Sequence, residues 1–93
     1  MFPVVWAREA LDDASRIADY ISDDNPAAAD RTSSIIFDSA EVLGQYPFMY
    51  RSGRRDGTRE AIVHPNYILV YGIEATQVRI VNVLHTARRC PPE

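Results

Sequence analysis

Lysine is absent from this 93-residue chain, and cysteine occurs once, as Cys90. A single cysteine excludes an internal disulfide and favours a reducing compartment, so we expect a cytoplasmic protein. No apolar run approaches the ~18 residues that a membrane-spanning helix needs, so we expect no contact with a membrane. The first residues turn acidic at once and lack a basic region, which argues against a signal peptide.

Glycine and histidine are also scarce, with four and two residues. No glycine-rich nucleotide loop is present, and no spacing of histidine, cysteine and acidic residues suits a metal, so we expect neither a cofactor nor a metal. The rest is typical of an ordinary folded domain, because 46% of the residues are hydrophobic and 25% are charged. This composition excludes a disordered chain and predicts a single domain over residues 1–93.

The charges divide unevenly along the chain. Residues 1–46 hold nine acids and three arginines, whereas residues 47–93 hold four acids and seven arginines. A GC-rich genome would explain why every basic residue is arginine, but it would not explain this distribution. The planar guanidinium suits carboxylates and phosphates. The second half therefore predicts a basic face for an acidic partner, with a merely solvated loop as the alternative.

The first half predicts a short strand and a helical hairpin. Residues 3–6 are apolar and β-prone, and apolar residues recur at the helical period over 7–22 and 26–43. Asn25 suits the N-cap and Pro26 the first position of the second helix. Gly44 is expected to end that helix in the left-handed conformation.

The second half predicts an antiparallel meander. A polar, glycine-rich segment at 51–57 precedes three β-prone runs at 58–63, 67–73 and 78–85, with short turns between them. We therefore expect an α+β fold in which an antiparallel helical hairpin packs on a C-terminal three-stranded antiparallel sheet, after a short N-terminal strand.

Two sets of residues are candidates for function. Glu60 and His85 would form an acid–base pair if their strands are neighbours, and a nuclease would then use Arg59, Arg79 and His85. The structural alternative is that Glu60 pairs with an arginine and His85 caps a strand end. Alternation along the last strand predicts that Arg79 shares a face with residues 81, 83 and 85. The candidates for binding a target or partner are Arg51, Arg54, Arg55, Arg59, Arg79, Arg88 and Arg89.

The order and spacing of several motifs resemble the RelE/ParE superfamily of toxins from bacterial type II toxin–antitoxin modules. The most specific motif is Gly57-Thr58-Arg59-Glu60. The other matching segments are residues 5–7, 10–13, 17–21, 25–29, 51–54, 66–71 and 83–89. The resemblance covers nearly the whole chain and implies the α+β fold described above.

Two departures separate the chain from the RelE-like branch, whose members cut mRNA on the ribosome. That branch commonly carries arginine before Leu-Val-Tyr in the central strand, and this chain has Ile68 there. An aliphatic side chain cannot hold a phosphate. Nuclease members also tend to be basic, whereas this chain has a net charge of −3. The chain is therefore most similar to the ParE branch.

Resemblance to ParE implies a growth inhibitor and plasmid-stabilisation protein that poisons DNA gyrase without chemistry of its own. It also implies a cognate antitoxin that folds over the toxin, in a groove between the helical hairpin and the sheet, and larger toxin–antitoxin assemblies. Two alternatives remain open at this point. One is a ribosome-dependent mRNA endonuclease, and the other is a non-toxic component that represses transcription together with its antitoxin.

Overall fold

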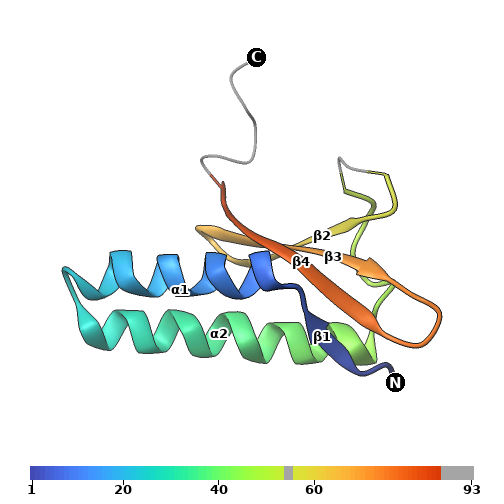
Figure 1. Cartoon of the computed structure of the whole chain (residues 1–93), viewed down its shortest axis with the longest axis horizontal. Coiled ribbons are helices and arrows are strands. Elements are labelled where there is room, and N and C mark those ends of the chain that lie inside the picture. The colour runs from blue at the N-terminus through green and yellow to red at the C-terminus, as the bar shows by residue number, and fades with distance from the viewer. Residues whose placement is uncertain (54–55, 87–93) are drawn as a thin grey trace, which may run out of the picture.

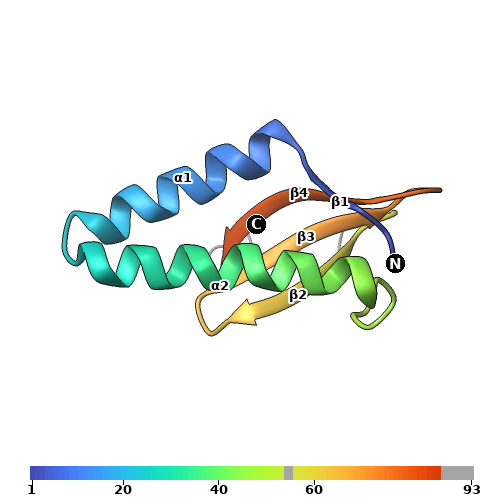
Figure 2. The ribbon, with the colours of Figure 1, turned by 90° about the horizontal axis from the view of Figure 1, so that it is seen from below.

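The computed structural model describes residues 1–53 and 56–86. The elements follow the order β1 (Val4–Trp6), α1 (Arg8–Ser22), α2 (Pro26–Gln45), β2 (Arg59–His64), β3 (Tyr67–Ile73) and β4 (Val78–His85). Figures 1 and 2 show the two helices running in opposite directions on one face of the sheet, so the expected two-layer α+β architecture is confirmed. In the described part of the chain, neither helix has the length and apolar character needed to cross a bilayer.

The sheet has four strands in the order β1-β4-β3-β2, one more than expected. β2, β3 and β4 form the antiparallel meander, and β1 adds to β4 in parallel, with Val4 opposite Val78. Backbone hydrogen bonds extend this pairing, since the Val78 N–H donates to the Pro3 carbonyl at 2.9 Å and the Ala7 N–H to the Ile80 carbonyl at 2.8 Å. β1 joins the sheet because its backbone groups need partners and β4 has a free edge.

The core lies between the helices and the inner face of the sheet. Alanines on the helices allow the two layers to approach closely, and aliphatic and aromatic side chains of the strands fill the space. The most buried of these residues are Ala10, Ile36, Ala40, Leu43, Ala61, Leu69, Tyr71, Val78 and Ile80.

The start of α2 agrees with the sequence, but its end does not. Asn25 caps the helix by accepting a 3.1 Å hydrogen bond from the Ala28 N–H, with Pro26 in the first position. Gly44 is helical, because Gly57, with φ of 81°, is the one described residue with positive φ. A side chain at Gly44 would collide with the carbonyl of Phe2, whose N–H donates to the Gly44 carbonyl at 2.8 Å. The glycine serves close packing, and the expectation of a left-handed cap is wrong.

A bulge in β4 overturns the expected alternation. The register shifts where Val70 faces Asn82 and Tyr71 faces Ile80, which leaves one extra residue in β4. Ile80 and Val83 both reach the core, although they are three positions apart. The residues after the bulge therefore swap faces, and Arg79 lies on the face opposite Val83 and His85.

Candidate functional site

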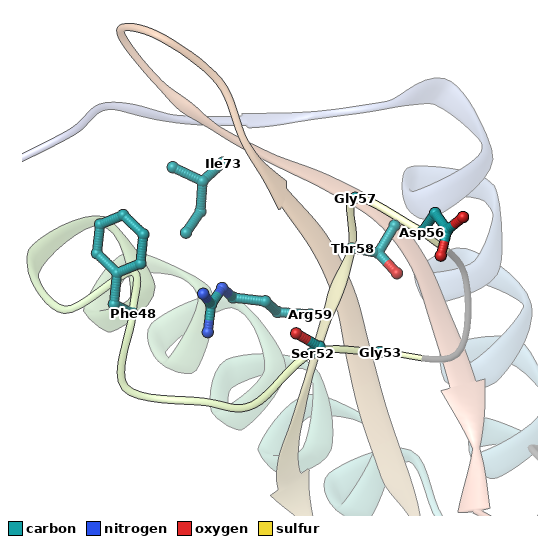
Figure 3. A pocket seen from close by; sticks show the side chains of 8 residues that line it. All are labelled: Phe48, Ser52, Gly53, Asp56, Gly57, Thr58, Arg59 and Ile73. Carbon is teal, nitrogen blue, oxygen red and sulfur yellow. The ribbon is translucent and has the colours of Figure 1, made fainter.

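A cavity of about 300 Å³ lies where β2 begins, around the Gly57-Thr58-Arg59 part of the most specific motif. It is formed by the segment after α2, the turn before β2 and the end of β3, as Figure 3 shows. The residues that line it are Phe48, Ser52, Gly53, Asp56, Gly57, Thr58, Arg59 and Ile73. We call this the Arg59 pocket.

The turn before β2 is held by a short antiparallel pairing. Ser52 faces Arg59, and the Gly53 N–H donates to the Thr58 carbonyl at 2.7 Å. A Cβ at Gly53 would lie 2.8 Å from the Thr58 hydroxyl, so a larger residue would require the Thr58 side chain to move. Gly57 supplies the left-handed backbone of the turn. The glycines of this segment therefore shape the wall of the pocket.

Arg59 is fixed in the pocket by uncharged groups. Its guanidinium donates to the Tyr50 carbonyl and lies over the Phe48 ring, 5.1 Å from the ring centroid. The described residues place no carboxylate oxygen within 4 Å of it. Arginine carries five N–H donors, so donors remain for a ligand. The side chain is therefore both preorganised and available to an anion.

Tyr71, in β3, holds the segment that follows α2. Its ring is fully buried, and its hydroxyl donates to the Pro47 carbonyl at 2.7 Å. Burial raises the pKa of the Tyr71 hydroxyl, while the charge of Arg59 acts in the opposite direction. The phenol therefore stays neutral and keeps its donor role.

A larger groove of about 640 Å³ lies at the opposite end of the sheet, between α1 and the end of β4. It is lined by Asp13, Arg16, Ile17, Tyr20, Tyr67, Val83, Leu84 and His85. Tyr67 packs against His64 and His85, with ring centroids 5.4 and 5.3 Å away. Burial, followed by the nearby Tyr20, raises the pKa of the Tyr67 hydroxyl. We call this the α1–β4 groove.

Asp13 joins the two layers beside this groove. Its Oδ2 accepts hydrogen bonds from Asn82 Nδ2 at 3.0 Å and from the Val83 N–H at 2.9 Å, and its Oδ1 pairs with Arg16. β1 pairs with β4 only as far as Ile80, and the Asp13 carboxylate supplies an acceptor for the Val83 N–H further along β4. No local pattern in the sequence around Asp13 signals a partner 70 positions away.

The candidate nuclease residues are not gathered at one point. Arg59 faces Tyr71 and Arg79 faces Gly72, whereas His85 faces Tyr67 at the other end of the strands. At about 3.3 Å per residue, Arg79 and His85 are roughly 20 Å apart along β4. Arg79 is instead engaged by Glu74 at 2.8 Å, and its hydrogen bond holds the pKa of the Glu74 carboxyl below its usual value, with a further contribution from Gln77.

The expectation that Glu60 and His85 form an acid–base pair on neighbouring strands is also wrong. β3 lies between β2 and β4, so Glu60 and His85 are not on neighbouring strands. Of the other basic candidates, Arg51 is exposed beside the Arg59 pocket, and its carbonyl accepts from the Glu60 N–H at 3.4 Å. Arg54, Arg55, Arg88 and Arg89 lie outside the described residues. Across residues 1–53 and 56–86, no three His, Cys, Asp or Glu side chains gather as a metal site would.

Comparison with known proteins gives a consistent family. Residues 4–90 match the family described as "ParE toxin of type II toxin-antitoxin system, parDE". A relative named Toxin RelE2, from Caulobacter vibrioides, is 36% identical over 88 residues, which cover 95% of this chain and 99% of the relative.

Solved structures show the same fold. The chromosomal ParDE toxin–antitoxin system of P. aeruginosa contains a chain that superposes with a TM-score of 0.84 at 18% identity, over 91% of this chain and 96% of that one. The RelBE2 toxin–antitoxin complex of Mycobacterium tuberculosis contains another, with a TM-score of 0.68 at 24% identity, over 90% and 96%.

Proposed function

Because the chain belongs to the ParE toxin family of type II toxin–antitoxin systems, we propose that it inhibits growth by binding DNA gyrase and stabilising the enzyme's cleaved-DNA state. Family membership confirms the resemblance seen in the sequence, a toxin of the RelE/ParE superfamily with an antitoxin as partner. Gyrase as target and the bacterial cytoplasm as location are part of the proposal. The toxin needs no covalent chemistry of its own, since gyrase itself cuts the DNA.

The observation that carries the proposal is the environment of Ile68. This residue occupies the position where the nuclease branch commonly has arginine, and it is 0% exposed in the central strand β3. Its cross-strand neighbours are Ile62 on β2 and Leu84 on β4, both aliphatic. Among the described residues, these two neighbours offer a phosphate neither a cation nor a side-chain donor. This packing at the centre of the sheet supports the gyrase proposal over RNA cleavage.

The arrangement of the remaining candidates supports the same conclusion. Phosphodiester cleavage needs an acid, a base and a charge-stabilising group around one phosphate. Arg59 and Arg79 lie at the opposite end of the strands from His85, and Arg79 is already paired with Glu74. The net charge of −3 also disfavours a ribosomal partner, whose RNA attracts basic proteins.

The test is a supercoiling and cleavage assay with purified gyrase and the purified toxin, with and without its antitoxin. Inhibition accompanied by cleaved DNA, and reversed by antitoxin, is the expected result. The alternative left open by the sequence is a ribosome-dependent mRNA endonuclease, so translating mRNA is examined by toeprinting in parallel. Codon-positioned cuts without any effect on gyrase would refute the proposal.

We further propose that the α1–β4 groove receives the antitoxin. It lies between the helical hairpin and the sheet, where the family resemblance places the antitoxin, and its apolar wall is formed by Ile17, Val83 and Leu84. Tyr20 is 78% exposed at its rim, and aromatic residues of this kind commonly anchor protein interfaces. The side chain of Arg16 is 71% exposed beside it and can meet an acidic residue.

The groove is tested by measuring antitoxin affinity for the Tyr20→Ala variant by calorimetry. Loss of the aromatic anchor should weaken binding at least tenfold. Tyr46→Ala is the matched control, because Tyr46 is a tyrosine that is 58% exposed and does not line the groove. Equal affinities for both variants and the wild type would place the antitoxin elsewhere.

A further inference from the structure

An exposed apolar ridge borders the Arg59 pocket. In the segment between α2 and β2, the side chains of Tyr46, Phe48 and Met49 are 58%, 67% and 55% exposed. Folded proteins seldom leave such side chains together in water without a use, and aromatic residues and methionine are enriched at protein interfaces. We call these three residues the aromatic ridge.

Arg59 supplies a charged group beside this ridge. Figure 3 shows its guanidinium beside Phe48 and below Ile73, while Asp56 and Thr58 lie on the other side of the strand. The carbonyl of Tyr50 uses part of its donor set, and the Phe48 ring supports the guanidinium plane. An arginine held by neutral groups loses little rotamer freedom when it binds a carboxylate. The Phe48 ring and the Arg59 guanidinium are therefore already positioned to bind a partner.

We propose that the Arg59 pocket and the aromatic ridge form the surface by which this toxin contacts its protein target. The partner segment would place a carboxylate on Arg59 and an adjacent apolar side chain against Phe48 and Ile73. This inference rests on the proposed function, since it assigns to the target a surface separate from the antitoxin groove.

Charge and surroundings favour a protein over a nucleic acid. A phosphate backbone would need a broad basic surface, whereas the chain has a net charge of −3 and the described lining of the pocket sets the acid Asp56 against the cation of Arg59. The wide apolar border matches a protein interface, in which a buried aromatic or arginine anchor carries most of the binding energy.

The distance between the Arg59 pocket and the α1–β4 groove favours the target, and not the antitoxin, as the partner of the pocket. The pocket lies beside the Arg59–Tyr71 pair, whereas the α1–β4 groove lies beside the Tyr67–His85 pair. Tyr67 and Tyr71 lie four positions apart in β3, which is roughly 13 Å along the strand. One segment of partner can therefore fill either site without filling the other.

The experiment measures affinity for purified gyrase and for the cognate antitoxin with four variants of the full chain. Phe48→Ala removes the exposed ring, and Arg59→Gln removes the charge. Ile62→Ala and Arg31→Gln are the matched controls, because Ile62 is 60% exposed and Arg31 is exposed, and both lie outside the pocket. Antitoxin affinity reports whether each variant is folded.

We expect Phe48→Ala and Arg59→Gln to weaken gyrase binding by roughly tenfold to a hundredfold, with antitoxin affinity unchanged within about twofold. The weakening by Arg59→Gln should shrink as salt rises, because a charge pair is screened. Because Arg59 also holds the Tyr50 carbonyl, Phe48→Ala decides the result if Arg59→Gln does not fold.

Each other outcome overturns the inference in a distinguishable way. If the wild type binds gyrase and Phe48→Ala binds it equally well, the surface is wrong although the proposed function stands. If Phe48→Ala loses antitoxin and keeps gyrase, the pocket belongs to the antitoxin. If the wild type itself does not bind gyrase, the proposed function fails and this inference fails with it.

Discussion

Replacing Asp13 by alanine should destabilise the contact between α1 and β4. The carboxylate accepts from Asn82 and from the backbone N–H of Val83, and its side chain is 13% exposed. Removing it leaves both donors without their acceptor in a partly buried place. A donor left unsatisfied in this way costs about 1–3 kcal/mol.

We therefore expect Asp13→Ala to lower the free energy of unfolding by about 2–3 kcal/mol. For a domain of this size, 1 kcal/mol corresponds to roughly 4–8 °C in Tm, so the melting temperature should fall by roughly 8–24 °C. Denaturant unfolding followed by circular dichroism gives the free energy. Hydrogen exchange at the Val83 amide gives a local readout, and its protection should fall.

Two variants separate the hydrogen bonds from the ion pair. Asp13→Asn keeps a carbonyl acceptor and should lose about half as much stability or less. Arg16→Gln removes only the ion pair, whose arginine side chain is 71% exposed, and should cost less than ~0.5 kcal/mol. If Asp13→Ala costs no more than Arg16→Gln, the carboxylate does not hold α1 to β4 and the reasoning is refuted.

Three other changes test separate parts of the fold. Gly44→Ala should cost about 1–3 kcal/mol in chemical unfolding, because a methyl group would collide with the N-terminal backbone, and a cost near zero would contradict that contact. Tyr71→Phe should cost about 1 kcal/mol by the same measurement, because it deprives the Pro47 carbonyl of its donor; no loss would mean that water replaces the hydroxyl. The Glu74 carboxyl should titrate by NMR at a lower pH than an ordinary glutamate, and Arg79→Gln should move its pKa back up. The stability that this pair adds is present above the unfolded-state pKa of glutamate and is lost as the pH falls through the lower folded-state pKa, so an unchanged pKa in Arg79→Gln would contradict the assignment.

Local patterns predicted most of the secondary structure. Asn25 followed by Pro26 marked the start of α2, because both the capping oxygen and the missing N–H act within one turn of the chain. The three β-prone runs likewise became β2, β3 and β4 within a residue or two of their expected bounds. These features depend on neighbours in sequence, so the sequence alone contains their cause.

The errors arise where distant parts of the chain meet. Gly44 was expected to end α2 in the left-handed conformation, but what requires a glycine there is the backbone of Phe2, which is far from position 44 in the sequence. The extra residue in β4 reversed the face of His85, and a bulge leaves no mark in a run of β-branched residues.

The candidate site divides in the same way. The motif Gly57-Thr58-Arg59-Glu60 was recognised as specific, and the cavity lies around its first three residues. Phe48 was not singled out, because its relation to Arg59 depends on the path of the segment between α2 and β2. Exposed aromatic residues in such a connection, close in sequence to an arginine-rich turn, were the signal that could have identified it.

The parallel pairing of β1 with β4 has a consequence for synthesis. Val4 is among the first residues that the ribosome makes, and its partner Val78 is made 74 positions later. Until β4 is made, β1 has no edge to pair with, and the core lacks Val78, Ile80 and Val83. Contacts of such long sequence separation slow folding and favour a single cooperative step late in synthesis. A chain interrupted before β4 would therefore leave the ribosome without a completed core, and translation that stops early would yield no active toxin.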